Sequence, residues 1–568
     1  MNCKRYCLLA FAICTLVPLL VFGQELRLAP YSGPGTFLNQ QIAADTVANG
    51  KLATRVYVLQ RGALYLANAV FTNAGGWKLS IKANDSATTK KPVIMLYPTG
   101  AGNTPWNPPG NFVQMGGDLV LKNLEISGYY ELVDTNRFNM QGALINIPST
   151  ASGLNITIDS CILSNTNGNH VRTDGVPSTI KITNSLFANL GYLGRSNLGA
   201  GKALDLRASA CDSLIMVNNT FVNWLDRIVR HYPNSGSGTG LLNYFRFEHN
   251  TLVNGTSYHG LLSLGTMGAK AIIANNLFID PFVLGNDTDA TRQVEFLPSG
   301  EVDPYGNPKM AWIFSYPNNT TQWIVSNNYY SISDSGQAFY TTYASAGVTG
   351  EGSPITLHIG SKLGSGASSA FTKLSVALTK IPMVMTNLAR WYRSPTGGKK
   401  LKNTPGAWTY GTLGNPDPYD YDRKSYSWLR DSLKCDYSTS SAAYSGATGG
   451  FPVGDLNWFP AIKASWLASP VSGVENKTQL PEAFSLDQNY PNPFNPATQI
   501  AYSVPSKTRV SLEVFDVLGR RIATLVDGIV QPGRYSVEFD ASKLASGVYF
   551  YRLSTSQQIL SRKMVLLK

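Results

Sequence analysis

The sequence predicts an all-β protein, a right-handed parallel β-helix followed by a small Ig-like β-sandwich. Charged residues make up only 14% of the 568 residues and aromatic residues 11%, and there are 52 glycines. This composition is typical of a turn-rich β protein and not of bulk disorder. One short pattern recurs seven times in the middle of the chain, and short alternating strands between turn residues occupy its last part.

The recurring pattern is an apolar residue, any residue, usually Asn, usually Asn or another small polar residue, any residue, and an apolar or aromatic one. From one copy to the next, the third positions are 37, 24, 34, 31, 26 and 52 residues apart, a variable period typical of stacked units. The copies are β-branched and aromatic and lie between turn residues, which predicts one strand per coil. The seven copies are Leu121–Ile126, Ile158–Leu163, Ile182–Phe187, Met216–Phe221, Phe247–Leu252, Ile273–Phe278 and Val325–Tyr330.

Stacked coils would bury the apolar side chains in one continuous column. We therefore expect Phe187, Phe221, Leu252 and Phe278 to stack inside it. The repeated Asn predicts a structural role, because amides at the same turn of every coil can hydrogen-bond along the stack. The alternative is that these amides bind sugar, at Asn184, Asn218, Asn275 and Asn327.

Sequence on either side of the repeats predicts the ends of the solenoid, within a domain of residues 24–470. Short strands from about residue 50 predict its start, with residues 24–50 as an N-terminal cap. The Pro-rich loop Thr104–Gly110 is expected on the surface, and the insertion Asp280–Asn319 either carries function or packs over a face. Residues 331–470 are rich in Trp, which predicts a C-terminal cap or, alternatively, an aromatic sugar-binding face.

The first residues predict export. Lys4 and Arg5 precede an apolar run, Cys7–Phe22, that ends at Gly23, which is typical of a signal peptide spanning residues 1–23. The run is shorter than the roughly 20 residues that a membrane-spanning helix needs, and we expect no transmembrane segment in the mature chain. Cys161, Cys211 and Cys435 lack metal-ligand spacing, and no disulfide framework is predicted, although a Cys161–Cys211 bridge stays open.

Several runs resemble secreted, pectate-lyase-like β-helix proteins of uncharacterised function that are exported by type IX systems. The runs are Gly201–Arg207, Val217–Asn223, Glu248–Asn254 and Val453–Trp458, and the resemblance covers roughly residues 50–470. It implies a fold shared with polysaccharide lyases, but a shared fold does not give the function.

After a polar linker, residues 471–483, the end of the chain closely resembles the type A sorting domain of the type IX secretion system. The matching runs are Asn489–Pro496, Val514–Gly519, Leu544–Tyr551 and Lys563–Lys568. The resemblance implies the type IX secretion machinery as partner, export through the periplasm, and a final location outside the cell or on its outer surface. It makes Gly547, Tyr549 and Lys563 candidate sorting residues.

The residues alone also predict a small β-sandwich at the end of the chain. Its expected strands are Ile500–Val504, Val510–Phe515, Tyr535–Phe539 and Val548–Leu553. The alternative to sorting is an Ig-like decoration that stays in place.

Charge points to an acidic partner. The net charge is +12, or +10 without Lys4 and Arg5. Nucleic acid is the less favoured partner, because the chain is expected to be exported and contains no nucleic-acid recognition motif. An acidic polysaccharide is predicted instead. Ionisable residues concentrate in three adjacent coils: Lys202, Asp205, Arg207, Asp226, Arg227, Arg230, His231, His249 and His259.

These residues predict a lyase-like β-elimination as one possible activity. A base removes the proton beside a uronate carboxylate, while Arg or Ca²⁺ stabilises the charge that develops. Catalytic candidates are Lys202, Arg207 and Arg227, substrate-binding candidates are Arg230, His231 and His249, and Asp205 and Asp226 are candidate calcium ligands.

A more specific expectation is a single basic groove on the outer face of the solenoid, formed by Arg207, Arg227, Arg230 and His231. The structural alternative is that Asp205–Arg207 and Asp226–Arg227 are ion pairs at coil corners. No Ser-His-Asp order, zinc motif or phosphate loop indicates another chemistry. The alternative function is a non-catalytic surface adhesin or extracellular matrix protein.

Overall fold

The chain divides into two compact units, residues 1–460 and 461–568. The computed structural model describes residues 25–52, 54–73, 76–85, 90–97, 111–128, 143–166, 168–191, 201–207, 209–231, 240–302, 306, 308–393, 432–469, 484–489, 491–530 and 533–567. The predicted signal peptide, the Pro-rich loop 104–110 and the predicted linker 471–483 lie outside these residues.

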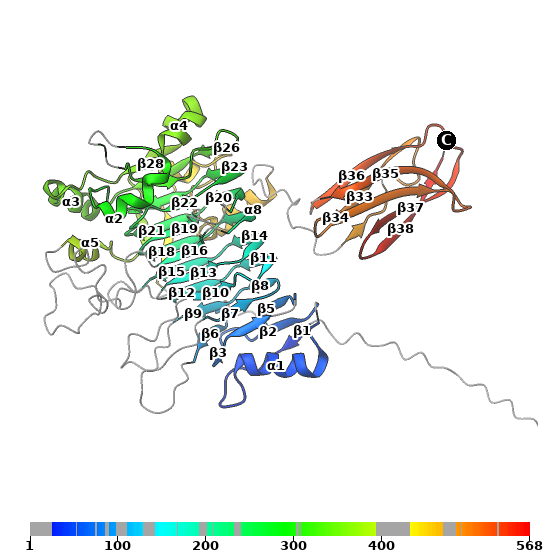
Figure 1. Ribbon diagram of the computed structural model, residues 1–568, viewed down its shortest axis with the longest axis horizontal. Helices are drawn as coiled ribbons and strands as arrows, with labels where there is room; N and C mark the ends of the chain where they lie inside the picture. The colour runs from blue at the N-terminus through cyan, green and yellow to red at the C-terminus, as the bar shows by residue number, and fades with distance from the viewer. Residues whose placement is uncertain are drawn as a thin grey trace, which may run out of the picture. The chain divides into compact units, whose positions relative to one another are not determined.

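The first unit is a parallel β-helix in which each coil adds one strand to each of three parallel sheets (Figure 1). Sheet A holds β1 (Glu25–Arg27), β2 (Val56–Leu59), β5 (Leu79–Ala83), β8 (Leu119–Lys122), β11 (Ser152–Asp159), β14 (Val176–Thr183), β17 (Cys211–Val217), β20 (Leu242–Glu248), β23 (Met267–Ala274) and β26 (Gln322–Ser326). Sheet B holds β3 (Leu64–Ala67), β6 (Val93–Leu96), β9 (Glu125–Ser127), β12 (Ile162–Thr166), β15 (Leu186–Leu190), β18 (Thr220–Trp224), β21 (Thr251–Gly255), β24 (Leu277–Ile279), β27 (Asn328–Ser331) and β29 (Phe371–Lys373). Sheet C holds β4 (Phe71–Asn73), β7 (Val113–Met115), β10 (Ala143–Ile147), β13 (Asn169–Thr173), β16 (Lys202–Arg207), β19 (Arg227–His231), β22 (Leu262–Leu264), β25 (Ala311–Phe314) and β28 (Ser353–Ile355).

Each copy of the sequence pattern forms the corner between sheets A and B, and not one strand. Its third residue has a left-handed backbone in every copy, with φ between 50° and 60°. Asn adopts this conformation more readily than most residues, which explains its recurrence there. The prediction of one strand per coil was therefore wrong, because a turn in the middle of each copy separates two strands.

The amide ladder is real but lies one residue later than predicted. Asn219, Asn250, Asn276 and Asn328 occupy the fourth position and are buried. Each side-chain Nδ2 donates to the Oδ1 of the next Asn in the ladder, at 3.0, 3.1 and 2.9 Å. A second ladder of Asn165, Asn189, Asn223 and Asn254 follows the strands of sheet B. The side-chain amides of both ladders are thus hydrogen-bonded to one another inside the stack.

The apolar column is confirmed. Phe187, Phe221, Leu252 and Phe278 are paired in register across adjacent strands of sheet B, and all four are completely buried. The rings of Phe187 and Phe221 lie 5.2 Å apart. Burying this continuous column is the main favourable contribution to the solenoid's stability.

Residues at the N-terminal end pack on the first coil of the solenoid. Strand β1 pairs with β2, and helix α1 (Leu38–Asn49) buries Leu38 and Ile42 in the solenoid core. At the other end, β28 and β29 close sheets C and B, and α4 (Leu357–Leu363) with the 3₁₀ helix η3 (Gly364–Ser369) packs against β26.

The insertion 280–319 packs over a face and also contains strand β25, which was not predicted. Its helix α2 (Ala290–Gln293) and 3₁₀ helix η1 (Val294–Ser299) precede that strand. Helices α3 (Asp334–Thr342) and α5 (Thr386–Arg393) form a satellite core with Leu225, Tyr258 and Leu284.

Described residues between β29 and the end of the first unit cover a side of the solenoid. Val376, Cys435 and Val453 pack against the apolar outer side chains of Val222 and Val253. The segment contains β30 (Leu378–Lys380), β31 (Lys434–Tyr437) and the 3₁₀ helices η4 (Ala442–Ser445) and η5 (Leu456–Trp458). The 3₁₀ helix η2 (Ala344–Ala346) precedes β29, and helix α8 (Pro460–Ala468) follows η5. The predicted C-terminal cap is therefore mainly a lateral cover over sheet B. Cys161, Cys211 and Cys435 are buried free thiols, so the Cys161–Cys211 bridge is absent.

The second unit is a β-sandwich of two antiparallel sheets around one core. One sheet has the order β32 (Ser485–Leu486), β33 (Ala497–Val504), β36 (Gly533–Asp540), and the other has the order β35 (Arg521–Val530), β34 (Thr508–Phe515), β37 (Gly547–Thr555), β38 (Ile559–Leu566). All four predicted strands are present, and β32, β35 and β38 were missed. In the described part of the chain, no helix is long and apolar enough to cross a membrane.

Candidate functional site

Two adjacent strands of sheet C bring together most of the predicted site residues. Strands β16 and β19 are adjacent, and their register places Lys202 opposite Arg227, Asp205 opposite Arg230 and Arg207 opposite His231. The spacing of one coil between Lys202 and Arg227 thus sets the residues side by side. Their burial, however, divides them into two groups.

The first group is a buried ionic cluster around Asp226. The Oδ2 atom of Asp226 lies 2.8 Å from Lys202 Nζ and 2.9 Å from Arg227 Nε, and its Oδ1 lies 2.7 Å from His259 Nδ1. Arg227 Nη2 reaches Glu295 Oε2 of η1 at 3.2 Å. Lys202 is 2% exposed, Arg227 1% and Asp226 0%. Helix η1 therefore helps to cover these charges.

Burial and pairing set the protonation states in the cluster. Burial would raise the pKa of Asp226, but Arg227, Lys202 and His259 hold it well below its usual value. Burial lowers the pKa of Lys202 to about 8 and that of His259 to about 4, although Asp226 acts in the opposite direction on both. At neutral pH, Lys202 and Arg227 thus balance Asp226 and Glu295, and the cluster carries no net charge that would attract a polyanion.

The prediction of one basic groove formed by Arg207, Arg227, Arg230 and His231 is wrong, because two of these side chains are buried. Arg227 is almost completely buried, and His231 is fully buried with its two ring nitrogens at 2.9 and 3.0 Å from the carbonyl oxygens of Leu264 and Ser209. The Asp226–Arg227 ion pair exists, as the structural alternative expected. The Asp205–Arg207 pair does not, because Asp205 binds Arg230 through two hydrogen bonds of 2.7 and 2.8 Å.

The candidate calcium ligands are already engaged. Asp205 accepts from Arg230 and from Asn169, and both oxygens of Asp226 face cations or His259. Direct ligation of Ca²⁺, which takes six to eight oxygen ligands, would have to break these pairs. Among the described residues, no group of three or more His, Cys, Asp or Glu is placed to hold a metal ion.

The second group is an exposed arginine pair, defined here as Arg172 and Arg207 on the shared Asp174. Arg172 Nε lies 3.4 Å from Asp174 Oδ2, and Arg207 Nε lies 3.0 Å from Asp174 Oδ1. The two side chains are 38% and 33% exposed, and their Nη groups make no hydrogen bond to any described residue. The carboxylate of Asp174 thus contacts the Nε atom of both arginines.

Arg172 and Asp174 were not among the residues predicted from the sequence. Arg172 lies on β13, one coil before β16, and its partner in register is Asp205. The available signal was the same coil spacing that placed Lys202 opposite Arg227. It was missed because the three coils selected for their charge began at Lys202.

His249 lies away from the other candidates, at the corner between sheets A and B. It is fully buried, and its Nδ1 lies 3.2 Å from the carbonyl oxygen of Gly454. The covering segment 448–458 also binds Asn218, Asn275 and Asn327, whereas Asn184 bonds to Asp159. These amides are used within the protein, which contradicts their assignment as sugar ligands.

Acid sensitivity is expected from His249. Burial lowers its pKa to about 3, compared with about 6.5 in an unfolded chain. The unfolded chain therefore takes up a proton that the folded chain cannot, and stability is lost as the pH falls below 6.5. The loss amounts to about 2 kcal/mol between pH 6.5 and 5 for this one group.

The variant His249→Asn tests this expectation, because Asn occupies the same left-handed position in neighbouring coils. We expect the variant to lose about 2 kcal/mol less stability than the parent between pH 7 and 5 in urea denaturation. An equal loss in parent and variant would show that His249 is not the titrating group.

In the second unit, the candidate sorting residues lie on the two C-terminal strands. Gly547 begins β37, and Tyr549 of the same strand donates from its hydroxyl to the carbonyl oxygen of Ala545 at 2.8 Å. Lys563 on β38 is paired in register with Phe550. The geometry thus places all three residues within the sandwich.

Comparison with known proteins identifies this second unit. Residues 488–567 match the family of secretion system C-terminal sorting domains. The comparison with curated proteins found no match to the chain. The chain thus combines a parallel β-helix with a type IX sorting domain, which indicates export to the cell surface or to the medium.

Proposed function

We propose that this secreted β-helix protein binds an acidic polysaccharide through the exposed arginine pair, without cleaving it at Lys202 and Arg227. The observation that carries the proposal is the shared Asp174, which contacts both guanidinium groups through their Nε atoms while the two arginine side chains remain 38% and 33% exposed. A planar guanidinium matches a carboxylate or sulfate group through two parallel hydrogen bonds.

The position of the pair supports a linear ligand. Arg172 and Arg207 come from adjacent strands of sheet C, which lie about 4.8 Å apart in a sheet. Arg230, on the next strand, is 18% exposed and extends the row by one coil. Two arginines on one carboxylate leave a net positive charge, in contrast to the neutral cluster around Asp226.

Cleavage receives no support from the burial of the candidate catalytic groups. A general base must come within hydrogen-bond reach of the proton that it removes. Lys202 and Arg227 are 2% and 1% exposed, and both bind Asp226. The arrangement therefore favours binding over β-elimination at these two residues, and a non-catalytic surface or matrix protein is consistent with it.

The double variant Arg172→Ala/Arg207→Ala tests the proposal. We expect binding to polygalacturonate or alginate to weaken at least about tenfold at low salt, because hydrogen bonds between charged groups contribute about 1.5–3 kcal/mol each. The difference should shrink as salt screens the exposed charges. Isothermal titration calorimetry at two salt concentrations measures both effects.

The matched control is Lys82→Ala/Lys122→Ala, which removes the same charge from adjacent strands of sheet A. It should bind as the parent does. Equal weakening in the control would reduce the interaction to non-specific charge attraction, and a parent that binds neither polymer would exclude the proposal. The variant Arg172→Lys/Arg207→Lys retains the charge but lacks the paired donors of a planar guanidinium. Its affinity for the polymer should therefore lie between that of the parent and that of the double alanine variant.

A further inference from the structure

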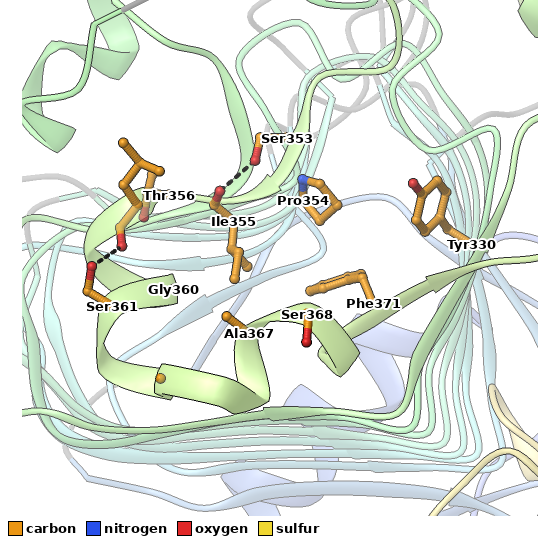
Figure 2. A pocket seen from close by; sticks show the side chains of 12 residues that line it. Tyr330, Ser353, Pro354, Ile355, Thr356, Gly360, Ser361, Ala367, Ser368 and Phe371 are labelled. Carbon is orange, nitrogen blue, oxygen red and sulfur yellow. Dashed lines mark hydrogen bonds between the residues drawn. The ribbon is translucent and has the colours of Figure 1, made fainter.

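A cavity of about 680 Å³ lies at the C-terminal end of the solenoid (Figure 2). The cavity is open to solvent on one side and is lined by residues of β27, β28, α4, η3 and β29. Sheet B ends at β29, so the apolar column ends here with the rings of Tyr330 and Phe371. The ring of Trp312 packs edge-on against the ring of Tyr330, with 5.0 Å between the ring centroids.

The cavity wall is uncharged. Its lining contains aromatic, aliphatic, Gly, Ser and Thr residues and no Asp, Glu, Lys, Arg or His. A charged ligand would lose its hydration there without a compensating partner. The site therefore fits a neutral molecule, and its size lies within the usual range of small-molecule sites, about 300–1,000 Å³.

One hydroxyl on this wall lacks a partner. Thr356 is 1% exposed, and its Oγ1 makes no hydrogen bond to any described residue. Thr356 directly precedes α4, but its side chain makes no capping hydrogen bond. A buried hydroxyl without a partner is costly, and each such group in a native structure requires an explanation.

Two further hydroxyls are oriented by the backbone. Ser353 and Ser361 donate to the carbonyl oxygens of Ile355 and Leu357, at 2.7 and 2.9 Å (Figure 2). Donation leaves the lone pairs of both hydroxyl oxygens as acceptors. The wall thus offers aromatic rings, acceptors and one unsatisfied hydroxyl.

We propose that this cavity binds an uncharged pyranose ring of a glycan. A pyranose presents apolar C–H faces that pack on aromatic rings and a rim of hydroxyl groups that both donate and accept. This combination matches the rings of Tyr330 and Phe371 together with the hydroxyl of Thr356, whereas an aliphatic chain would leave that hydroxyl unsatisfied. The site is separate from the exposed arginine pair and does not depend on the function proposed for it.

Calorimetry on the full chain tests the ligand class with four probes: cellotriose, xylotriose, mannotriose and decanol, with trigalacturonate as a charged control. We expect at least one neutral trisaccharide to bind with a dissociation constant in the millimolar range or below. Substitutions in this cavity should not change the affinity for trigalacturonate. Binding of decanol alone would overturn the proposal in favour of an apolar ligand. Binding of none of the four would leave the cavity as a packing gap only.

Two variants locate the binding. A Cβ at Gly360 would meet only Ala367 Cβ and Ile355 Cδ1, both at 3.9 Å, so a side chain can start there without a clash, and Gly360→Leu is chosen to fill the cavity. It should abolish trisaccharide binding and leave the melting temperature unchanged or higher. Thr356→Val removes the hydroxyl at constant shape and should weaken binding about tenfold while the fold is retained, because that hydroxyl has no partner to lose.

The matched control is Thr372→Val, which makes the same change on an exposed residue of neighbouring β29. It should bind trisaccharide as the parent does. Binding that is equally strong in the parent, Thr356→Val and Gly360→Leu would place the sugar elsewhere and overturn the assignment. Loss of binding in Thr372→Val would indicate a surface site in place of the cavity.

Discussion

Deletion of residues 484–568 is expected to leave the protein in the periplasm. The deleted part contains residues 488–567, which match the secretion system C-terminal sorting domain. It has a core of its own, which shares no residue with the core of the solenoid. The truncated chain should therefore keep its fold and lose only the sorting signal. Cell fractionation, together with protease accessibility on intact cells, measures the change.

A smaller deletion sharpens this test. Removing residues 559–568 deletes β38, whose Met564 and Leu566 are fully buried in the sandwich core. Loss of these side chains should unfold the module, because removing one buried Met or Leu side chain already costs about 2–5 kcal/mol. We expect the same retention in the periplasm. Full surface delivery of either truncated chain would support the alternative of an Ig-like decoration.

The β-helix was predictable because its signal is periodic. Apolar residues at Phe187, Phe221, Leu252 and Phe278 must align when coils of variable length stack, and they do. The turn within each copy was not predictable by the same rule. A left-handed Asn between two short strands gives the same pattern of apolar and polar residues as one continuous strand, and only the backbone geometry distinguishes them.

The sequence predicted which candidate site residues lie opposite each other on adjacent strands, but not whether their side chains are buried or exposed. The spacing of one coil correctly placed Lys202 opposite Arg227. Their burial depends on His259 and Glu295, which lie 33 and 68 residues from their partners in sequence. The same limit applies to His249, which is covered by a segment that follows it by about 200 residues. Contacts over such distances arise from how the chain returns to the solenoid, which local patterns do not encode.

The variant Asp226→Asn is expected to lower the free energy of unfolding by about 3–5 kcal/mol, the usual cost of removing one partner of a buried ionic network. All three neighbours of the carboxylate, namely Lys202, Arg227 and His259, present donors to it. An amide in its place would turn one NH₂ group toward a donor and leave two cations buried without their shared anion. Urea denaturation followed by circular dichroism measures the effect.

A matched control separates this effect from the general loss of a carboxylate. Glu351 pairs with Lys373 near the solenoid's C-terminal end, where the two side chains are 22% and 50% exposed. Glu351→Gln should change the free energy of unfolding by less than about 1 kcal/mol, because solvent screens this pair. If Asp226→Asn were no more damaging than this control, the cluster would have to be open to water, and Lys202 and Arg227 would return as candidates for contact with a substrate.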